Sequence, residues 1–209
     1  MSDFSELTEA LIKGDEAKVI ELTRKAMDAG TPAGEILKAG LIVGMDVVGE
    51  KMENEEMFIP EVLMSAKSMG AAVEILKPHL SAEDAASKGV VVIGTVKGDL
   101  HDIGKNLVAM MLESAGLDVH NVGVDIGPEQ FVSAIKEKNA NLVCLSALLT
   151  TTMPMMKSTV EALVESGVRD SVKVLVGGAP VTQGFADDIG ADGYAPDAGS
   201  AAKLAKSLV

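Results

Sequence analysis

The chain has 209 residues, 47% of them hydrophobic, which is enough for one large or two small folded domains and excludes a disordered protein. Its formal charge of −13 argues against nucleic acid and anionic membranes as partners. No signal peptide and no apolar run of membrane-spanning length is found, so we expect a cytoplasmic protein. The single cysteine, Cys144, lies in an apolar run and is interpreted as a small core residue.

The first 80 residues show only helical periodicity and predict four helices joined by short loops. Their boundary signals are caps at Ser5 and Asp15, a stop at Gly30, and starts at Pro32 and Pro60. The inner faces of the third and fourth helices are predicted at Leu37, Leu41, Met45, Val48 and Met52, and at Val62, Leu63, Ala66, Met69, Val73 and Leu76. Short loops favour an antiparallel four-helix bundle.

Residues 81–89 are small and polar and are interpreted as a linker, which divides the chain into domains 1–88 and 89–209. Beyond it, strands and helices alternate. The expected strands are 90–93, 118–122, 142–146, 172–176 and 193–195, and the expected helices are 104–115, 128–138, 154–166, 182–189 and 199–208. This alternation predicts a doubly wound α/β domain with five parallel strands.

The strand ends of such a sheet open on one edge, where ligands bind. The loop after the first strand brings an imidazole, His101, between two acidic residues, Asp99 and Asp102. The later loops are small and hydroxylated. They contain Gly123, Val124 and Asp125, then Ser146 to Leu148 and Thr150 to Thr152, and then Gly177, Gly178 and Ala179. We therefore expect the chemistry at this edge.

Three motifs in order carry a family resemblance: Asp99-x-His101-x-x-Gly104, then Ser146-x-Leu148, then Gly177-Gly178. Together they resemble the signature of the cobalamin-binding Rossmann-like domain of methyltransferases and mutases. The preceding helices, with Met57-Phe58-Ile59-Pro60, resemble the four-helix cap found beside that domain in methionine synthase and in small corrinoid proteins. The resemblance covers nearly the whole chain. It implies a flavodoxin-like α/β domain preceded by a helical cap.

The resemblance also implies a role for each motif residue. The cofactor would be cobalamin or a related corrinoid, bound base-off and His-on, with His101 as the lower cobalt ligand. Asp99 would hold the other imidazole nitrogen, and this contact fixes the tautomer. By alignment, the hydroxyl that completes a proton relay in the family falls at Thr152, where the family has serine.

Further positions would hold the corrinoid. A nucleotide tail needs a slot without bulky side chains, and the backbone near Gly104 could hold its phosphate. The full set of implied cofactor contacts is Gly94, Gly98, Leu100, Asp102, Ile103, Gly104, Val124, Ser146, Leu148, Thr150, Gly177, Gly178 and Ala179. The implied contacts of the cap with the upper corrin face are Met52, Ile59 and Val62, with Met52 replacing an aromatic residue of methionine synthase.

The catalytic modules of methionine synthase and the mutase barrel are absent from this sequence, so the resemblance implies a minimal methyl carrier that is not an enzyme by itself. A substrate-specific methyltransferase would load a methyl group onto cob(I)alamin. A second methyltransferase would move it from methyl-Co(III) to coenzyme M or tetrahydrofolate, and a reductive activating protein would rescue Co(II). The linker would be the hinge that lets the cap swing away.

Other interpretations stay open. Without the other motifs, His101 and Asp99 could simply cap a helix. A zinc or iron site on Asp99, His101 and Asp102 is a second possibility, although only three histidines exist in the chain. A third is a cobalamin-dependent sensor, but the acidic N-terminal half has no basic helix-turn-helix to bind DNA.

Overall fold

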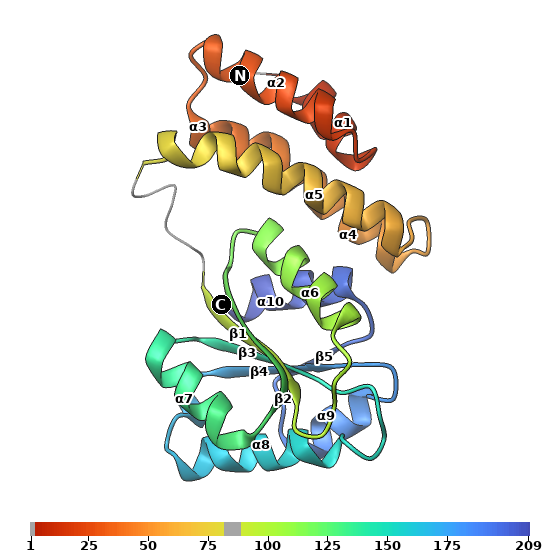
Figure 1. Cartoon of the computed structure of the whole chain (residues 1–209), viewed down its shortest axis with the longest axis vertical. Coiled ribbons are helices and arrows are strands. Elements are labelled where there is room, and N and C mark those ends of the chain that lie inside the picture. Colours follow the sequence, from red (N-terminus) through yellow and green to blue (C-terminus); the bar gives the residue numbers. More distant parts are fainter. Residues whose placement is uncertain (1–2, 82–88) are drawn as a thin grey trace. The chain divides into compact units, whose positions relative to one another are not determined.

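The computed structural model describes residues 3–81 and 89–209, which form two compact units. The first unit is helical and the second alternates strands with helices (Figure 1). Most of the predicted linker, residues 82–88, lies outside the described residues. Among the described residues, no helix combines the length and apolar character needed to cross a bilayer.

The helical unit contains the predicted four helices, the third of them interrupted. Its elements are α1 (Ser5–Ile12), α2 (Glu16–Asp28), α3 (Ala33–Glu35), the π-helical η1 (Ile36–Ile42), α4 (Val43–Glu53), α5 (Ile59–Leu76) and the 3-10 turn η2 (Lys77–His79). Asp15 caps α2 as predicted, because its side chain accepts from Lys18 N–H. The predicted cap at Ser5 is wrong, because Asp3 Oδ1 accepts the Ser5 N–H at 2.9 Å.

The π-helical segment was not predicted, and it shifts the buried face of the third helix. Because the hydrogen bonds of a π-helix join residues five apart, Ile36 and Leu41 lie on the same side and are both fully buried, whereas Leu37 is only half-buried. Gly40 lets this segment approach α1 closely, since a Cβ there would lie 2.9 Å from Leu7 Cδ2. The Thr8 hydroxyl donates to the Gly40 carbonyl at 3.0 Å and fixes the contact.

The inner face of α5 is broader than the apolar spacing predicts. Leu63, expected inside, is 38% exposed, while Ser65 and Ser68 are buried. Both serine hydroxyls donate to backbone carbonyls, of Ile12 at 3.2 Å and of Met64 at 2.9 Å. These hydrogen bonds satisfy the polar atoms, so small polar residues can take core positions.

The second unit is a five-stranded parallel sheet of order β2-β1-β3-β4-β5, as the α/β prediction required. The strands are β1 (Val90–Val96), β2 (Asp118–Ile126), β3 (Leu142–Ser146), β4 (Lys173–Gly177) and β5 (Gly193–Ala195). The helices are α6 (Ile103–Ser114), α7 (Pro128–Lys138), α8 (Pro154–Glu165), the 3-10 turn η3 (Arg169–Ser171), α9 (Gln183–Ile189) and α10 (Ala198–Leu208). The order reverses beside β1, so the crevice at its carboxyl end is the expected ligand site.

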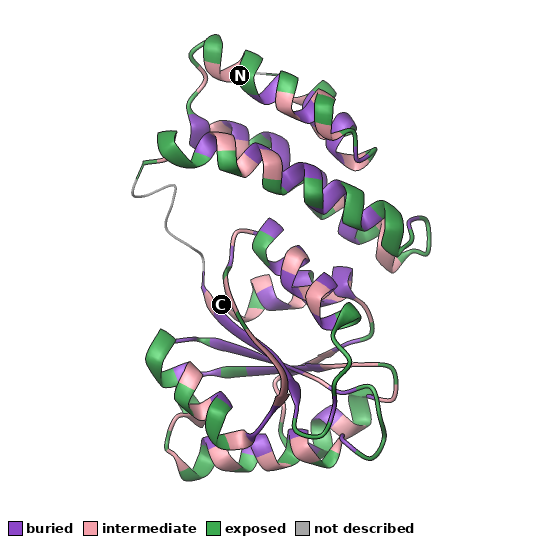
Figure 2. Ribbon diagram, viewed as in Figure 1, coloured by how far each residue is buried: buried purple, intermediate pink, exposed green. Residues whose placement is uncertain are grey.

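Helices cover both faces of the sheet, with α6 and α10 on one and α7, α8 and α9 on the other (Figure 1). The core on the α7 side packs Phe131, Met156 and Leu163 against strand residues such as Val92 and Val143. The central strands β1 and β3 are therefore buried on both faces, whereas the edge strand β2 is partly exposed (Figure 2). A sheet held this rigidly gives the loops at its edge a fixed base.

Candidate functional site

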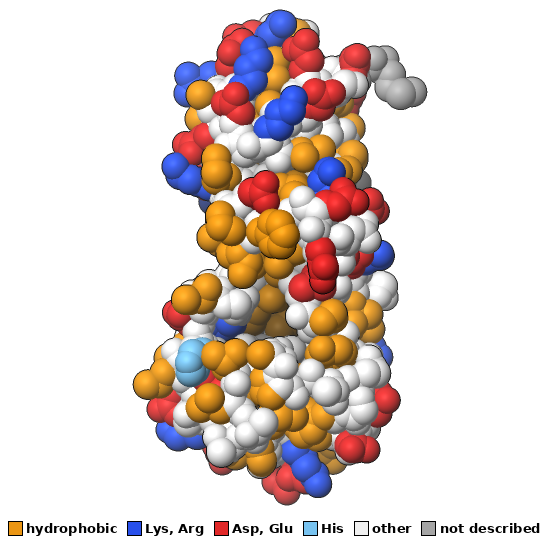
Figure 3. Space-filling view, turned by 90° about the vertical axis from the view of Figure 1, so that its right-hand side faces the viewer, with side chains coloured by type: hydrophobic (Ala, Val, Ile, Leu, Met, Phe, Trp, Pro, Cys, Tyr) orange, Lys and Arg blue, Asp and Glu red, His pale blue; other side chains and the backbone are white. Residues whose placement is uncertain are grey.

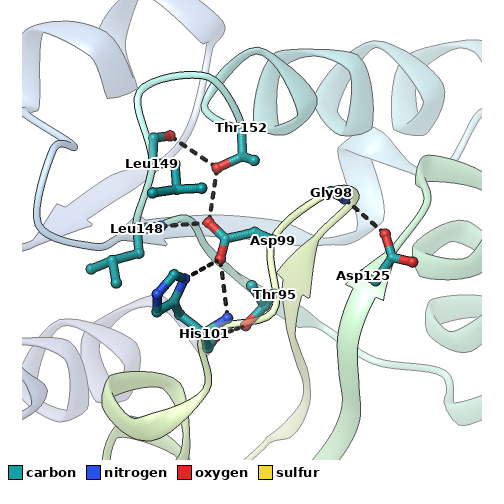
Figure 4. Close-up of polar contacts among 8 residues, drawn as sticks. All are labelled: Thr95, Gly98, Asp99, His101, Asp125, Leu148, Leu149 and Thr152. Carbon is teal, nitrogen blue, oxygen red and sulfur yellow. Dashed lines mark hydrogen bonds and ion pairs between the residues drawn. The ribbon is translucent and has the colours of Figure 1, made fainter.

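The loop between β1 and α6 places Asp99 inside the protein and His101 at its surface. Asp99 is fully buried, whereas the His101 side chain is 55% exposed. Asp99 Oδ1 lies 2.9 Å from His101 Nδ1 and also accepts the His101 N–H at 3.1 Å (Figure 4). A two-residue spacing lets one carboxylate oxygen bind both the backbone and the ring of the histidine.

The second carboxylate oxygen of Asp99 binds the loop after β3. Oδ2 accepts the Leu148 N–H and the Thr152 hydroxyl, each at 2.8 Å. Burial by itself raises the pKa of Asp99, but the hydrogen bonds to the carboxylate outweigh burial and hold the pKa well below its ordinary value. Asp99 is therefore ionised at neutral pH.

The ionised carboxylate decides the tautomer of His101. A carboxylate can only accept, so Nδ1 of a neutral His101 must carry the proton. The lone pair then lies on Nε2, on the exposed side chain, where no hydrogen bond from another described residue is found. A neutral imidazole in this state can bind a metal through Nε2, with its orientation and basicity set by the carboxylate behind it.

The predicted Asp99, His101 and Thr152 thus come together, although they lie in two loops. Thr95, which the sequence analysis did not single out, supports them from β1. Its buried hydroxyl donates to the His101 carbonyl at 2.8 Å. The one feature of the sequence that could have indicated Thr95 is its position at the carboxyl end of the first strand.

Asp125 is a second residue that the sequence analysis named in its loop but did not choose as a site residue. Its Oδ1 accepts the Gly98 N–H at 2.8 Å (Figure 4). Its own N–H donates to the Asp99 carbonyl at 3.0 Å. The hydrogen bond from Gly98 lowers the pKa of Asp125, with a smaller contribution from Lys97, whose Nζ lies 3.4 Å away. Asp125 is thus a charged partner of the loop that carries His101.

Exposed hydrophobic side chains flank the imidazole. Leu100 and Ile103, its neighbours in sequence, are 72% and 76% exposed, and Leu148 and Leu149 are also exposed. Figure 3 shows hydrophobic side chains gathered beside the pale-blue imidazole visible on that face. Exposed apolar residues gathered around one polar group are typical of a binding site.

Gly178, the first residue after β4, is required by the backbone. Gly178 has a φ of +128°, and a Cβ there would lie 1.9 Å from the Ala147 carbonyl oxygen. Ala147 N–H in turn donates to the Gly177 carbonyl at 3.2 Å. The loops after β3 and β4 therefore meet through main-chain atoms, with Ser146 and Ala179 beside them.

Gly94 is explained by packing on the α7 side of the sheet. A Cβ at this position would meet Val122 Cγ2 at 2.7 Å and Phe131 Cε1 at 2.9 Å. Its predicted place in a nucleotide slot beside α6 stays a prediction, because the α7 face already accounts for its missing side chain. Of the other predicted contacts, Gly98 has a φ of +83° in the turn before Asp99, Gly104 and Thr150 are exposed, and Val124 is half-buried in β2.

Asp102 belongs to a second polar cluster. Its Oδ2 accepts from Asn106 Nδ2 at 3.1 Å, and Asn106 Oδ1 accepts from Asn121 Nδ2 at 3.0 Å. Asn121 Oδ1 in turn accepts from the Lys105 ammonium at 2.7 Å. This chain of side chains joins α6 to β2.

In the helical unit, the predicted contacts divide into an exposed Ile59, a half-buried Met52 and a fully buried Val62.

The described residues contain no group of three or more His, Cys, Asp or Glu side chains placed to hold a metal ion. His101 alone offers one nitrogen. A single imidazole among apolar side chains fits a metal ion that needs one ligand from the protein, because a macrocycle supplies most of its other ligands. The residues therefore fit a corrinoid as the bound group.

Fold and site together define an α/β protein of the cofactor-binding kind, with an exposed imidazole held by a buried carboxylate at the carboxyl edge of its sheet. Two family models, each described as a B12 binding domain, match residues 89–203 and 4–77. The chain belongs to this B12-binding family and is one of its small corrinoid proteins, and its cofactor is a corrinoid. The predicted resemblance is confirmed.

Individual relatives agree along the whole length. Dimethylamine corrinoid protein 2 of Methanosarcina acetivorans is 47% identical over 98% of this chain and 94% of its own. The crystal structure of a cobalamin-binding protein from Desulfitobacterium hafniense is 34% identical, with a TM-score of 0.87 over 100% of both chains. The methanol:cobalamin methyltransferase complex of Methanosarcina barkeri is 32% identical, with a TM-score of 0.84 over 97% of this chain and 78% of the matched chain.

Proposed function

We propose that this protein is a methyl carrier that receives a methyl group from a separate, substrate-specific methyltransferase and delivers it to a second one. The bound corrinoid supplies a cobalt that takes up and releases the methyl group. The observation that carries the proposal is the state of His101, with Nδ1 bound to Asp99 and Nε2 exposed. The protein itself would hold and orient the cofactor and control the proton of the imidazole ligand.

The hydrogen-bonded residues control the proton of the ligand. If His101 were released from cobalt, its Nε2 could take up a proton. The resulting imidazolium is stabilised through Nδ1 by the ionised Asp99. Proton uptake and loss of the ligand are therefore coupled.

The relatives suggest which partners to try. The name of the 47% identical relative points to dimethylamine as methyl donor, with a dimethylamine-specific methyltransferase as first partner. Coenzyme M or tetrahydrofolate would be the final acceptor, and a reductive activating protein would restore oxidised cobalt. The charge of −13 favours basic docking surfaces on these partners.

Cofactor binding tests the first step. Wild-type protein mixed with hydroxocobalamin and desalted should stay coloured, with the visible spectrum of imidazole-ligated cobalt. His101→Ala should lose that spectrum. His120→Ala is the matched control, because His120 also pairs with an aspartate, Asp118, at 3.4 Å but lies in β2. Identical spectra for wild type and His101→Ala would refute the proposal.

Methyl transfer tests the second step. The cob(I)alamin form is mixed with methyltransferases specific for dimethylamine, monomethylamine, glycine betaine and aryl methyl ethers, each with its substrate. Methylation is followed by the visible spectrum. Uptake with the dimethylamine enzyme alone would support the assigned donor, and uptake with another enzyme would replace it. No uptake from any of them would argue against a carrier.

A further inference from the structure

Asp125 forms two hydrogen bonds with the loop that carries His101. Its carboxylate accepts the Gly98 N–H, and its backbone N–H donates to the Asp99 carbonyl. The two bonds flank the Gly98–Asp99 peptide unit, so they fix where the Asp99 side chain starts. Because the ring of His101 is held by that side chain, a change in the Asp99 backbone passes directly to the imidazole.

The backbone of Asp125 is adapted to this contact. Its φ of +58° lies in the left-handed region, which few non-glycine residues enter. Among the described residues, Glu55 and Asn139 share this feature, but they lie at helix ends, whereas Asp125 lies inside β2. A positive φ within a strand has no capping role to explain it. It needs another cause.

The pairing of β1 with β2 supplies that cause. Gly94 pairs with Gly123, but Val96 pairs with Ile126. Over this interval β2 therefore contains one residue more than β1, which is a β-bulge. Such a bulge re-aims side chains beside functional sites. Here it turns both the N–H and the carboxylate of Asp125 toward the loop after β1.

We infer that Asp125 is a positioning residue for the lower cobalt ligand: it holds the Gly98–Asp99 peptide so that Asp99 presents His101 Nε2 to the metal. The inference rests on the proposed cofactor site and adds a residue to it. Asp125 acts through Asp99, while Thr95 holds the other end of the loop through the His101 carbonyl.

Three variants separate the contributions. Asp125→Gly removes the carboxylate but accepts a positive φ without strain. Asp125→Asn keeps an acceptor oxygen, tolerates the left-handed region and loses the charge. Lys97→Met removes the ion pair and leaves the hydrogen bond to Gly98 in place. Only the glycine variant should release the loop.

Two readouts follow each variant. In the apoprotein, amide exchange at Gly98 should accelerate about tenfold in Asp125→Gly and stay near wild type in the other two. In protein loaded with hydroxocobalamin, acid titration followed by the visible spectrum gives the pH at which imidazole leaves cobalt. In Asp125→Gly this pH should rise by about one unit, which corresponds to about tenfold weaker binding of the imidazole to cobalt. Asp125→Asn should restore the wild-type pH.

The outcomes separate the two proposals. If wild-type protein never shows imidazole-ligated cobalt, the proposed cofactor site fails and the inference falls with it. If wild type shows it and Asp125→Gly titrates like wild type, only the inference is overturned. If Asp125→Asn titrates like Asp125→Gly, the role of the side chain as an acceptor is overturned as well. If Asp125→Gly cannot be purified folded, Asp125→Asn decides alone, and a shift of its titration pH away from the wild-type value overturns that role.

Discussion

Thr152 and Asp99 are joined by a hydrogen bond of 2.8 Å across 53 residues of sequence. The same Thr152 hydroxyl lies 2.9 Å from the Leu149 carbonyl. A hydroxyl has one proton, so it can donate to only one of these acceptors at a time. With Asp99 ionised it donates to the carboxylate, and it can turn to Leu149 if Asp99 gains a proton.

Replacing Thr152 by Val should raise the pKa of Asp99, because the carboxylate loses one of its donors while burial is unchanged. At pH 7 we expect a loss of about 1–2 kcal/mol in the free energy of unfolding. A lowered folded-state pKa gives stability that is full above the unfolded value and lost as the pH falls through the folded one. The loss on acidification starts near the unfolded pKa in both proteins, but in Thr152→Val it should be smaller and be complete at a higher pH, because only the folded pKa has risen.

Urea unfolding at a series of pH values measures this effect. Thr152→Ser is the control, since it keeps the hydroxyl and removes only the methyl group. Equal acid stability of the valine variant and wild type would show that the hydroxyl does not stabilise the carboxylate.

His101 and His120 should show opposite tautomers in the apoprotein. Asp99 faces Nδ1 of His101, whereas Asp118 faces Nε2 of His120. Nitrogen NMR of the neutral rings should find the proton on Nδ1 of His101 and on Nε2 of His120. A proton on Nε2 of His101 would contradict the account of the ligand given above. In Asp99→Ala the preference at His101 should disappear while that at His120 stays.

Lys105 should make stability rise with pH. Burial lowers the pKa of its ammonium, although the nearby Asp102 opposes this shift. Between the folded pKa and the higher unfolded one, the unfolded chain binds more protons, so stability increases with pH in that interval. Lys105→Met should lose this increase, as measured by urea unfolding from neutral to alkaline pH. Lys157→Met, at an exposed position, should keep it.

Gly178→Ala should destabilise the α/β unit by about 3 kcal/mol or more, because the added Cβ would overlap the Ala147 carbonyl and the φ is positive. Gly184→Ala is the matched control. Gly184 lies in α9 with no atom within 4 Å of the added Cβ, so it should be neutral or gain about 0.5 kcal/mol. Urea unfolding of both variants compares them. Equal stabilities would mean that the two loops can separate.

The sheet could be predicted from the sequence because its strands are short apolar runs between helical segments. The third and fifth strands match their predicted bounds, and α7 does too. β1 and β2 extend beyond their predicted ends, through Val96 and Ile126. The added stretches mix glycine and polar residues with apolar ones and so break the apolar run, and they contain Thr95 and Asp125, which hold the His101 loop.

The site was predictable where chemistry and spacing coincide, as at Asp99 and His101. Asp125 was missed because its importance depends on backbone conformation and on a shift in strand pairing, which residue type does not reveal. The exposure of Leu63 escaped prediction for a related reason. Periodicity gives a face, but hydrogen bonds let Ser65 and Ser68 displace a leucine from it.

The π turn between Ile36 and Ile42 has a consequence far along the same helix. One additional residue in a turn rotates everything after it by about 100° about the axis. The direction in which Met52 points is thus decided ten residues before it. Deleting the additional residue would restore an α turn and leave Met52 in place, whereas converting the π turn to an α turn at unchanged length would swing Met52 by about 100° to another side of the helix.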